Sequence, residues 1–225
     1  MCREVIAKDS RQQIAELAIL DTMTNFLQNL SGAFKRDPSF MVLTHPHSAL
    51  QQACEEVDLK SGESLRGLIA GLTKAMDEHD GVGMAAPQVG VMKRVLIYRV
   101  GEQDRPRVLI NPRITAFSKQ KVTADEGCLS FPNIYFPVER AEYICVEALD
   151  ENGTPISLQD VGGFTARVIQ HECDHLDGIM ITQRAKPHVR TAALRAYATF
   201  DRQDQEYITI TDDQDPAANA PEGDK

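Results

Sequence analysis

Residues 171–175, His-Glu-Cys-Asp-His, have the types and spacing of a metal-binding helix. Residues four apart lie on the same face of an α-helix, so His171 and His175 can bind one metal ion together. Glu172 is about 100° further around the helix, beside the metal and its bound water, where a carboxylate can act as a general base. The alternative is a core helix that carries two histidines by coincidence.

A catalytic metal site needs a third protein ligand and one open position. Metzincin peptidases supply a third histidine six residues after the second, but this chain has Ile181 there. Thermolysin-like peptidases supply a downstream glutamate, and the glutamates after His175 are Glu206 and Glu222, both in an acidic tail. Cys128 is the better candidate, because a thiolate with two imidazoles suits Zn²⁺ or Fe²⁺.

A further segment, residues 81–88, combines small residues with an amide side chain. It lacks the Lys-Ser/Thr of a nucleotide-binding loop and precedes no helix that could receive a phosphate, which argues against nucleotide binding. Its glycines and alanines would let an extended substrate backbone lie close. Gln88 would offer an amide donor to a developing oxyanion.

The elements that position these segments follow from hydrophobic periodicity. Apolar residues at helical spacing predict helices over about 14–30, 65–78, 165–176 and 188–200, with Ser61 or Ser64 as a cap of the second. Short apolar runs predict strands at 94–100, 107–110, 114–117, 143–149 and 155–158, and Asn152-Gly153 predicts a hairpin between the last two. The order of these elements favours an α+β fold with antiparallel pairing.

The composition is that of a globular protein with uneven charge. Of 225 residues, 42% are hydrophobic and 25% charged, and the net charge of −9 argues against nucleic-acid binding through bulk charge. Residues 201–225 contain eight acidic and two basic residues, so they carry most of that charge. We therefore expect three parts: a helical extension at 1–37, a central domain at 38–200, and an acidic tail at 201–225 that is disordered at least beyond Thr211.

Location can also be inferred from composition. The sequence has no apolar run long enough to span a bilayer and no signal-peptide core. The five cysteines are widely spaced and include no CxxC pair, which favours a reducing cytoplasm over a disulfide framework.

Together, the three segments resemble motifs of the bacterial peptide deformylases. The family motifs GxGxAAxQ, EGCLS and QHExDHLxG stand here at 81–88, 126–130 and 170–178, in the family's order. The resemblance covers roughly residues 40–186. It implies an α+β fold in which antiparallel β-sheets surround a central HExxH helix, here with an extra N-terminal helix and an acidic C-terminal tail.

The resemblance also implies an activity, namely removal of the N-formyl group from the formyl-methionine of nascent polypeptides, with release of formate. By motif position, Cys128, His171 and His175 would bind one divalent metal, with Fe²⁺ as the native ion and Zn²⁺, Ni²⁺ or Co²⁺ as alternatives. Glu172 would be the general base and acid.

Other residues would bind the substrate. By the resemblance, the Gln88 side chain and the Leu129 backbone N–H would hold the oxyanion. We expect Val82, Leu129 and Val168 to line an apolar methionine pocket, with the Gly83 backbone pairing to the peptide; as an alternative, these apolar side chains are ordinary core.

Supporting contacts and partners complete the expectations. Glu126 and Arg140 are expected to form an ion pair that supports the Cys128 loop, and Asp174 to be structural. A modest basic cluster, formed by Arg184, Lys186, Arg190 and Arg195, matches the region that docks on the ribosome in some members, although the acidic tail opposes such a contact. No membrane or direct DNA binding is expected.

The alternatives to deformylase activity are an HExxH-type metallopeptidase and a non-catalytic binding protein on the same scaffold.

Overall fold

The computed structural model describes residues 40–61, 64–99, 101, 105–200 and 207–212. The helix expected within residues 14–30, the rest of the 1–37 extension and the end of the acidic tail lie outside the described residues. In the part of the chain that is described, no helix is long and apolar enough to cross a membrane.

The described α-helices match three of the expected ones. They are α2 (Arg66–Glu78), α3 (Gly163–Leu176) and α4 (Pro187–Thr199). Four 3₁₀ turns accompany them: η1 (Ser48–Gln51), η2 (Leu59–Ser61), η3 (Ala86–Val89) and η4 (Ile181–Gln183). The expected serine cap is wrong, since α2 follows Leu65 and no side chain caps it in the described region. Its buried stripe, which includes Leu72 and Met76, holds it in place instead.

Five strands form one antiparallel sheet in the order β1-β2-β3-β6-β7. They are β1 (Gly83–Ala85), β2 (Val95–Tyr98), β3 (Arg107–Phe117), β6 (Tyr143–Leu149) and β7 (Pro155–Gly162). The hairpin predicted at Asn152-Gly153 is confirmed by the pairing of Leu149 with Pro155. The two runs expected at 107–110 and 114–117 form one strand, because β3 continues through a register shift between Ile110 and Arg113.

A second sheet was missed by the sequence pattern. It has the order β4-β5-β8 and consists of β4 (Lys121–Cys128), β5 (Phe131–Ala141) and β8 (Ile208–Thr209). β4 and β5 pair antiparallel, whereas β5 and β8 pair parallel. The first five residues of β4 are all exposed, so β4 lacks the alternation of apolar and polar residues that predicts a half-buried strand.

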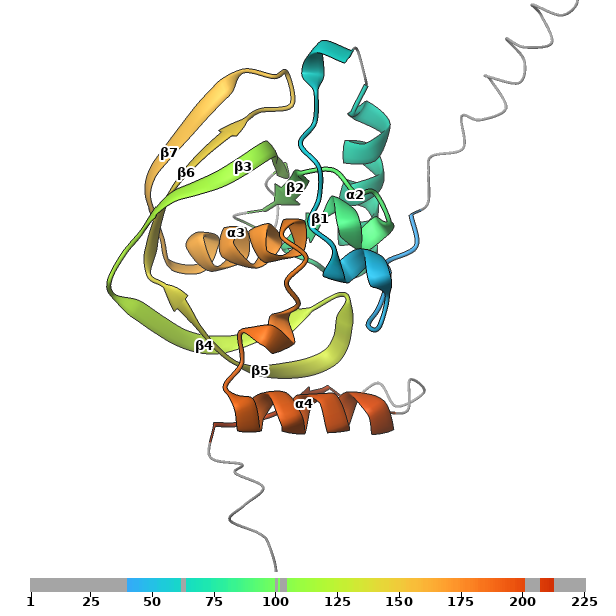
Figure 1. Ribbon diagram of the computed structural model, residues 1–225, viewed down its shortest axis with the longest axis vertical. Coiled ribbons are helices and arrows are strands. Elements are labelled where there is room, and N and C mark those ends of the chain that lie inside the picture. Colours follow the sequence, from blue (N-terminus) through green and yellow to red (C-terminus); the bar gives the residue numbers. More distant parts are fainter. Residues whose placement is uncertain (1–39, 62–63, 100, 102–104, 201–206, 213–225) are drawn as a thin grey trace, which may run out of the picture. The chain divides into compact units, whose positions relative to one another are not determined.

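Helix α3 lies at the centre of the fold, between the two sheets (Figure 1). Its apolar residues, including Ala166, Ile169 and Leu176, pack with β2, β3 and β6 residues in one core cluster. A second cluster joins α2 to β1, β2 and β3. A third joins β5 to α4. α3 itself contacts β1, β2 and β7 of the first sheet and β5 of the second. Because it is enclosed in this way, the polar groups on α3 must find partners within the protein.

The chain continues to pack on the domain after α4. Ile210 is buried in the third core, and its N–H donates to the Tyr135 carbonyl at 2.8 Å. Asp212 forms an ion pair with Lys186 and a polar contact with His188 at the start of α4. Residues 207–212 thus belong to the packed domain, although the composition placed them in the tail. The average composition of an acidic segment does not indicate that a single isoleucine within it, Ile210, is buried in the core.

Replacing Ile210 by alanine tests this packing. We expect Ile210→Ala to lower the free energy of unfolding by at least about 2 kcal/mol, the usual cost of removing a buried isoleucine side chain. Ile208→Ala is the matched control, because Ile208 lies two residues before Ile210, on β8, and is 36% exposed. It should cost about 0.5 kcal/mol or less. Equal, small losses in urea unfolding of both variants would contradict the assigned packing.

Candidate metal centre

Helix α3 carries three of the predicted site residues to one place. The His171 and His175 rings lie edge to face with their centroids 5.1 Å apart, as i and i+4 positions of one helix require. Glu172, which directly follows His171 in the sequence, is also buried. The helical spacing predicted for this motif is therefore present.

Cys128 reaches the histidines from the end of β4. Its Sγ lies 3.2 Å from His175 Nε2, and the ligand atoms of Cys128, His171 and His175 all lie within 4.8 Å of one another. Among the described residues, these three form the group of potential ligands that could hold a metal ion. A buried thiolate with two imidazoles is a donor set that Zn²⁺ and Fe²⁺ accept, so the residues present fit such an ion.

Gly127 allows the Tyr135 ring of β5 to lie close to the β4 backbone. A Cβ atom at this position would lie 2.4 Å from that ring, so any larger residue would displace the ring. Gly127 thus lets β5 cover the outer face of β4 while Glu126 and Cys128 are buried.

The electrostatics favour a thiolate at Cys128. Burial alone would raise the pKa of this thiol, but the neighbouring His175 and His171 imidazoles lower it to about 5. Since the thiolate is the form that binds metals, the site prepares its sulfur ligand.

Glu126 orients the first histidine. Its Oε2 lies 3.0 Å from His171 Nδ1, which leaves His171 Nε2 for a metal. Arg140 donates to both carboxylate oxygens at 3.0 Å, so the predicted ion pair is confirmed. Although burial opposes ionisation, hydrogen bonds from His171 and Arg140 lower the pKa of Glu126 to about 2.

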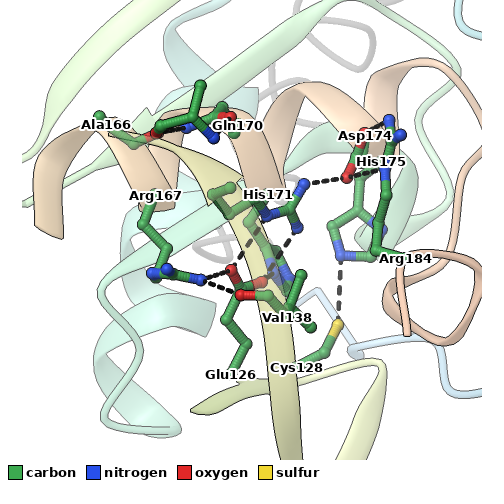
Figure 2. Close-up of polar contacts among 12 residues, drawn as sticks. Glu126, Cys128, Val138, Ala166, Arg167, Gln170, His171, Asp174, His175 and Arg184 are labelled. Atoms are coloured by element: carbon green, nitrogen blue, oxygen red, sulfur yellow. Dashed lines mark hydrogen bonds and ion pairs between the residues drawn. The ribbon is translucent and has the colours of Figure 1, made fainter. Parts of the chain in front are cut away.

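Two further residues of this network were not predicted as partners. Arg167 binds Glu126 from α3, and Arg184 binds Asp174, which also receives a hydrogen bond from Arg140 (Figure 2). Asp174 thus has the structural role expected of it. A sequence signal for Arg167 existed only in its position four residues before His171, on the same helix face.

Glu172 has the opposite environment to that of Glu126. Burial raises its pKa to about 7, and its Oε2 has no hydrogen-bond partner among the described residues. A Cβ atom on Gly83 would lie 2.4 Å from Glu172 Oε1, which shows how closely β1 passes this carboxylate. An unpaired buried carboxylate is costly, so it suits a group that exchanges a proton.

The amide of Gln88 has a defined orientation. Its Oε1 accepts the Ala85 N–H at 2.8 Å, and its Nε2 donates to Ser130 Oγ at 3.3 Å. Gln88 is buried, and its amide nitrogen therefore faces the loop that contains Leu129. The geometry brings the 81–88 and 126–130 segments together.

The three apolar side chains expected to bind the substrate differ in exposure. Val168 is buried and Leu129 is half-buried, whereas Val82 is 43% exposed. The side chain of Val168 lies against Gly83, and the side chain of Leu129 lies against Gly81. A mixture of buried and exposed apolar side chains beside β1 is compatible with a pocket wall.

Other cysteines and histidines of the described chain, and the residue at the metzincin position, have different surroundings. Ile181, at the position of a third metzincin histidine, is buried in the third core. Burial raises the pKa of the Cys173 thiol to about 12 and of the Cys54 thiol to about 11, which leaves both protonated. His188 contacts Asp212, and His47 accepts the Ala49 N–H.

Comparison with known proteins gives a consistent result. The family profile described as polypeptide deformylase matches residues 40–191. The chain belongs to this family. Peptide deformylase 1 of Bacillus subtilis is 44% identical over 144 residues, which are 64% of this chain and 88% of that protein. This chain is therefore a metal-dependent hydrolase with peptide deformylase activity, and Cys128, His171 and His175 form its metal site.

Solved deformylase structures share the fold. A deformylase from Legionella pneumophila matches with a TM-score of 0.67 at 34% identity, over 72% of this chain and 95% of that one. A deformylase from Acinetobacter baumannii with bound Met-Ala-Ser matches with a TM-score of 0.62 at 33% identity, over 66% and 99% of the two chains. The α+β fold with antiparallel sheets around the HExxH helix is thus confirmed for the described domain.

A single added methyl group tests the contact between β1 and Glu172. Gly83→Ala should displace the Glu172 carboxylate, because the new Cβ would overlap Glu172 Oε1, and deformylation should fall at least about tenfold, the scale expected for a misplaced catalytic group. Metal content should remain equal to that of the parent, since no ligand is touched. Gly67→Ala on the exposed face of α2 meets nothing within 4 Å and is the control. Full activity of Gly83→Ala would contradict this arrangement.

Proposed function

We propose that this chain hydrolyses the N-formyl group of formyl-methionine at the start of nascent polypeptides and releases formate. The observation that carries the proposal is the Cys128, His171 and His175 group with the unpaired Glu172 carboxylate beside it. The Acinetobacter baumannii relative binds Met-Ala-Ser, a peptide that begins with methionine.

The proposal includes Fe²⁺ as the native metal, with Zn²⁺, Ni²⁺ or Co²⁺ as substitutes. One thiolate and two imidazoles suit a divalent ion of this kind, which Cys128 Sγ and the His171 and His175 rings would hold. When bound, such an ion supplies Lewis acidity at the formyl oxygen and lowers the pKa of an attacking water molecule.

Glu172 is proposed to move the proton. It accepts a proton from the attacking water and then gives that proton to the nitrogen of the leaving amine. The pKa of about 7, which results from burial, supports both steps because it lies near neutral pH. The unpaired Oε2 atom has no competing partner in the described structure.

The oxyanion is proposed to bind Gln88 and Leu129. An amide NH₂ group has two hydrogens, and the bond to Ser130 uses one, so the other can reach the formyl oxygen. Leu129 is the residue after the metal ligand Cys128, so its backbone N–H lies close to the metal site. One such donor contributes about 3–4 kcal/mol to transition-state stabilisation in comparable sites.

The methionine side chain is proposed to lie against Val82, Leu129 and Val168, with the Gly83 backbone pairing to the peptide. β1 supports this assignment because its position beside Glu172 places the Gly83 backbone next to the reacting groups. A strand edge offers the alternating donors and acceptors that an extended peptide needs.

We further propose a cytoplasmic location and at most a transient ribosome contact. The four described cysteines are free thiols, and Cys128 must stay reduced to bind metal. In the basic cluster, Arg184 pairs with Asp174 and Lys186 with Asp212, which reduces the charge available to RNA. This charge balance gives no support to direct DNA binding.

Formate release is the deciding measurement for this function. Anaerobically purified protein should convert formyl-Met-Ala-Ser to formate and Met-Ala-Ser, and metals should be quantified in the same sample. Met-Ala-Ser without the formyl group should remain uncut. Cleavage of its peptide bonds would instead favour the metallopeptidase alternative, and no turnover in a metal-loaded sample would favour a binding protein.

Two substitutions separate proton transfer from metal binding. Glu172→Ala should retain the metal and lose turnover by at least about 100-fold, in line with the usual contribution of a general acid–base group. Cys128→Ala should lose metal and activity together. Turnover by Glu172→Ala at the parent rate, with full metal content, would remove Glu172 from the mechanism.

A further inference from the structure

Arg167 links three elements beside the metal centre. From α3, its Nη1 donates to Glu126 Oε1 at 2.6 Å and to the Val138 carbonyl at 2.9 Å (Figure 2). Its Nη2 donates to the Val122 carbonyl at 2.6 Å. Since Glu126 and Val122 lie on β4 and Val138 lies on β5, this one guanidinium group binds both strands of the hairpin that delivers Cys128.

The contact with Glu126 is one hydrogen bond away from a metal ligand. Glu126 Oε1 accepts from Arg167 and Arg140, while Oε2 accepts from Arg140 and contacts His171 Nδ1. The guanidinium group of Arg140 binds the carboxylate groups of Glu126 and Asp174, and these side chains can move together with it. Arg167 is anchored to two backbone carbonyls, so it ties the carboxylate to the strands themselves.

We propose that Arg167 is a positioning residue for the metal centre. It holds the Glu126 carboxylate in the orientation that accepts the His171 Nδ1–H, and it thereby keeps His171 Nε2 directed at the metal. The inference rests on the proposed function only in that Cys128, His171 and His175 bind a metal ion. Loss of the direct hydrogen-bond partner of a ligating histidine typically changes metal affinity about 10–100-fold, and Arg167 acts through that partner, Glu126.

Arg94 provides a matched control for a purely structural role. Its Nη1 donates to Asp177 Oδ1 at 2.6 Å and to the Leu176 carbonyl at 3.4 Å, and its Nη2 donates to the Pro112 carbonyl at 3.1 Å. It therefore also joins α3 to a strand through one carboxylate and two carbonyls. The two arginine side chains are similarly buried, with 18% exposure for Arg94 and 12% for Arg167. The contacts of Arg94 in the described structure include neither Glu126 nor a metal ligand.

The test measures metal affinity directly. The Zn²⁺ dissociation constants of the parent, Arg167→Met, Arg167→Lys and Arg94→Met are determined by competition with a chromophoric chelator, and Tm is recorded for each. Arg167→Met should raise the dissociation constant about tenfold or more. Arg167→Lys should raise it less, because an ammonium group can still bind Glu126 but not both carbonyls at once. Arg94→Met should stay within about twofold of the parent while lowering Tm.

The absorption bands of the Co²⁺ form give a second readout. A reoriented His171 should shift these bands in Arg167→Met and leave them unchanged in Arg94→Met. The proposal is overturned if Arg167→Met binds Zn²⁺ as tightly as the parent, or if Arg94→Met weakens binding equally. If Arg167→Met does not fold, Arg167→Lys decides by the same comparison. Formate release by the parent, measured in parallel, tests the proposed function separately.

Discussion

The buried carboxylate of Glu126 is the charge on which the arrangement of this domain depends. Moving a carboxylate out of water costs several kcal/mol, so it is tolerated only where cations and hydrogen-bond donors replace the water. Here the replacements are Arg140 on β5 and Arg167 and His171 on α3. Because they come from different elements, β4, β5 and α3 must meet at this point. Cys128, two residues after Glu126, is thereby brought to the histidines.

The same constraint extends along α3. Asp174 is buried and shares Arg140 with Glu126, and Arg184 binds its other side. Glu172, one residue after His171, is buried without such partners, and its pKa is raised where that of Glu126 is lowered. The surroundings of these two buried carboxylates thus shift their pKa values in opposite directions. Different environments are the general way in which a fold gives two carboxylates different properties.

The sequence predicted α2, α3, α4 and the β6–β7 hairpin because their information is local. Apolar residues recur at helical spacing in α2 and α3, and Asn152-Gly153 favours a tight turn. The β4–β5 hairpin was missed because its partners are distant elements and because most of β4 faces solvent. Ile210 was missed for a related reason, since its burial depends on β5 and α4 and not on its acidic neighbours.

For the site, the sequence by itself determined the chemistry that is available. Helix geometry places the i, i+4 histidines on one face with a glutamate next to them. Ligand chemistry and the EGCLS motif added Cys128 as the third ligand. Only the tertiary structure decided how these groups are held. The nitrogen of His171 that faces a carboxylate, the unpaired state of Glu172 and the contact of Arg167 with both strands all result from packing between residues far apart in the chain. No local pattern specifies such contacts, since they exist only once the sheets close around α3.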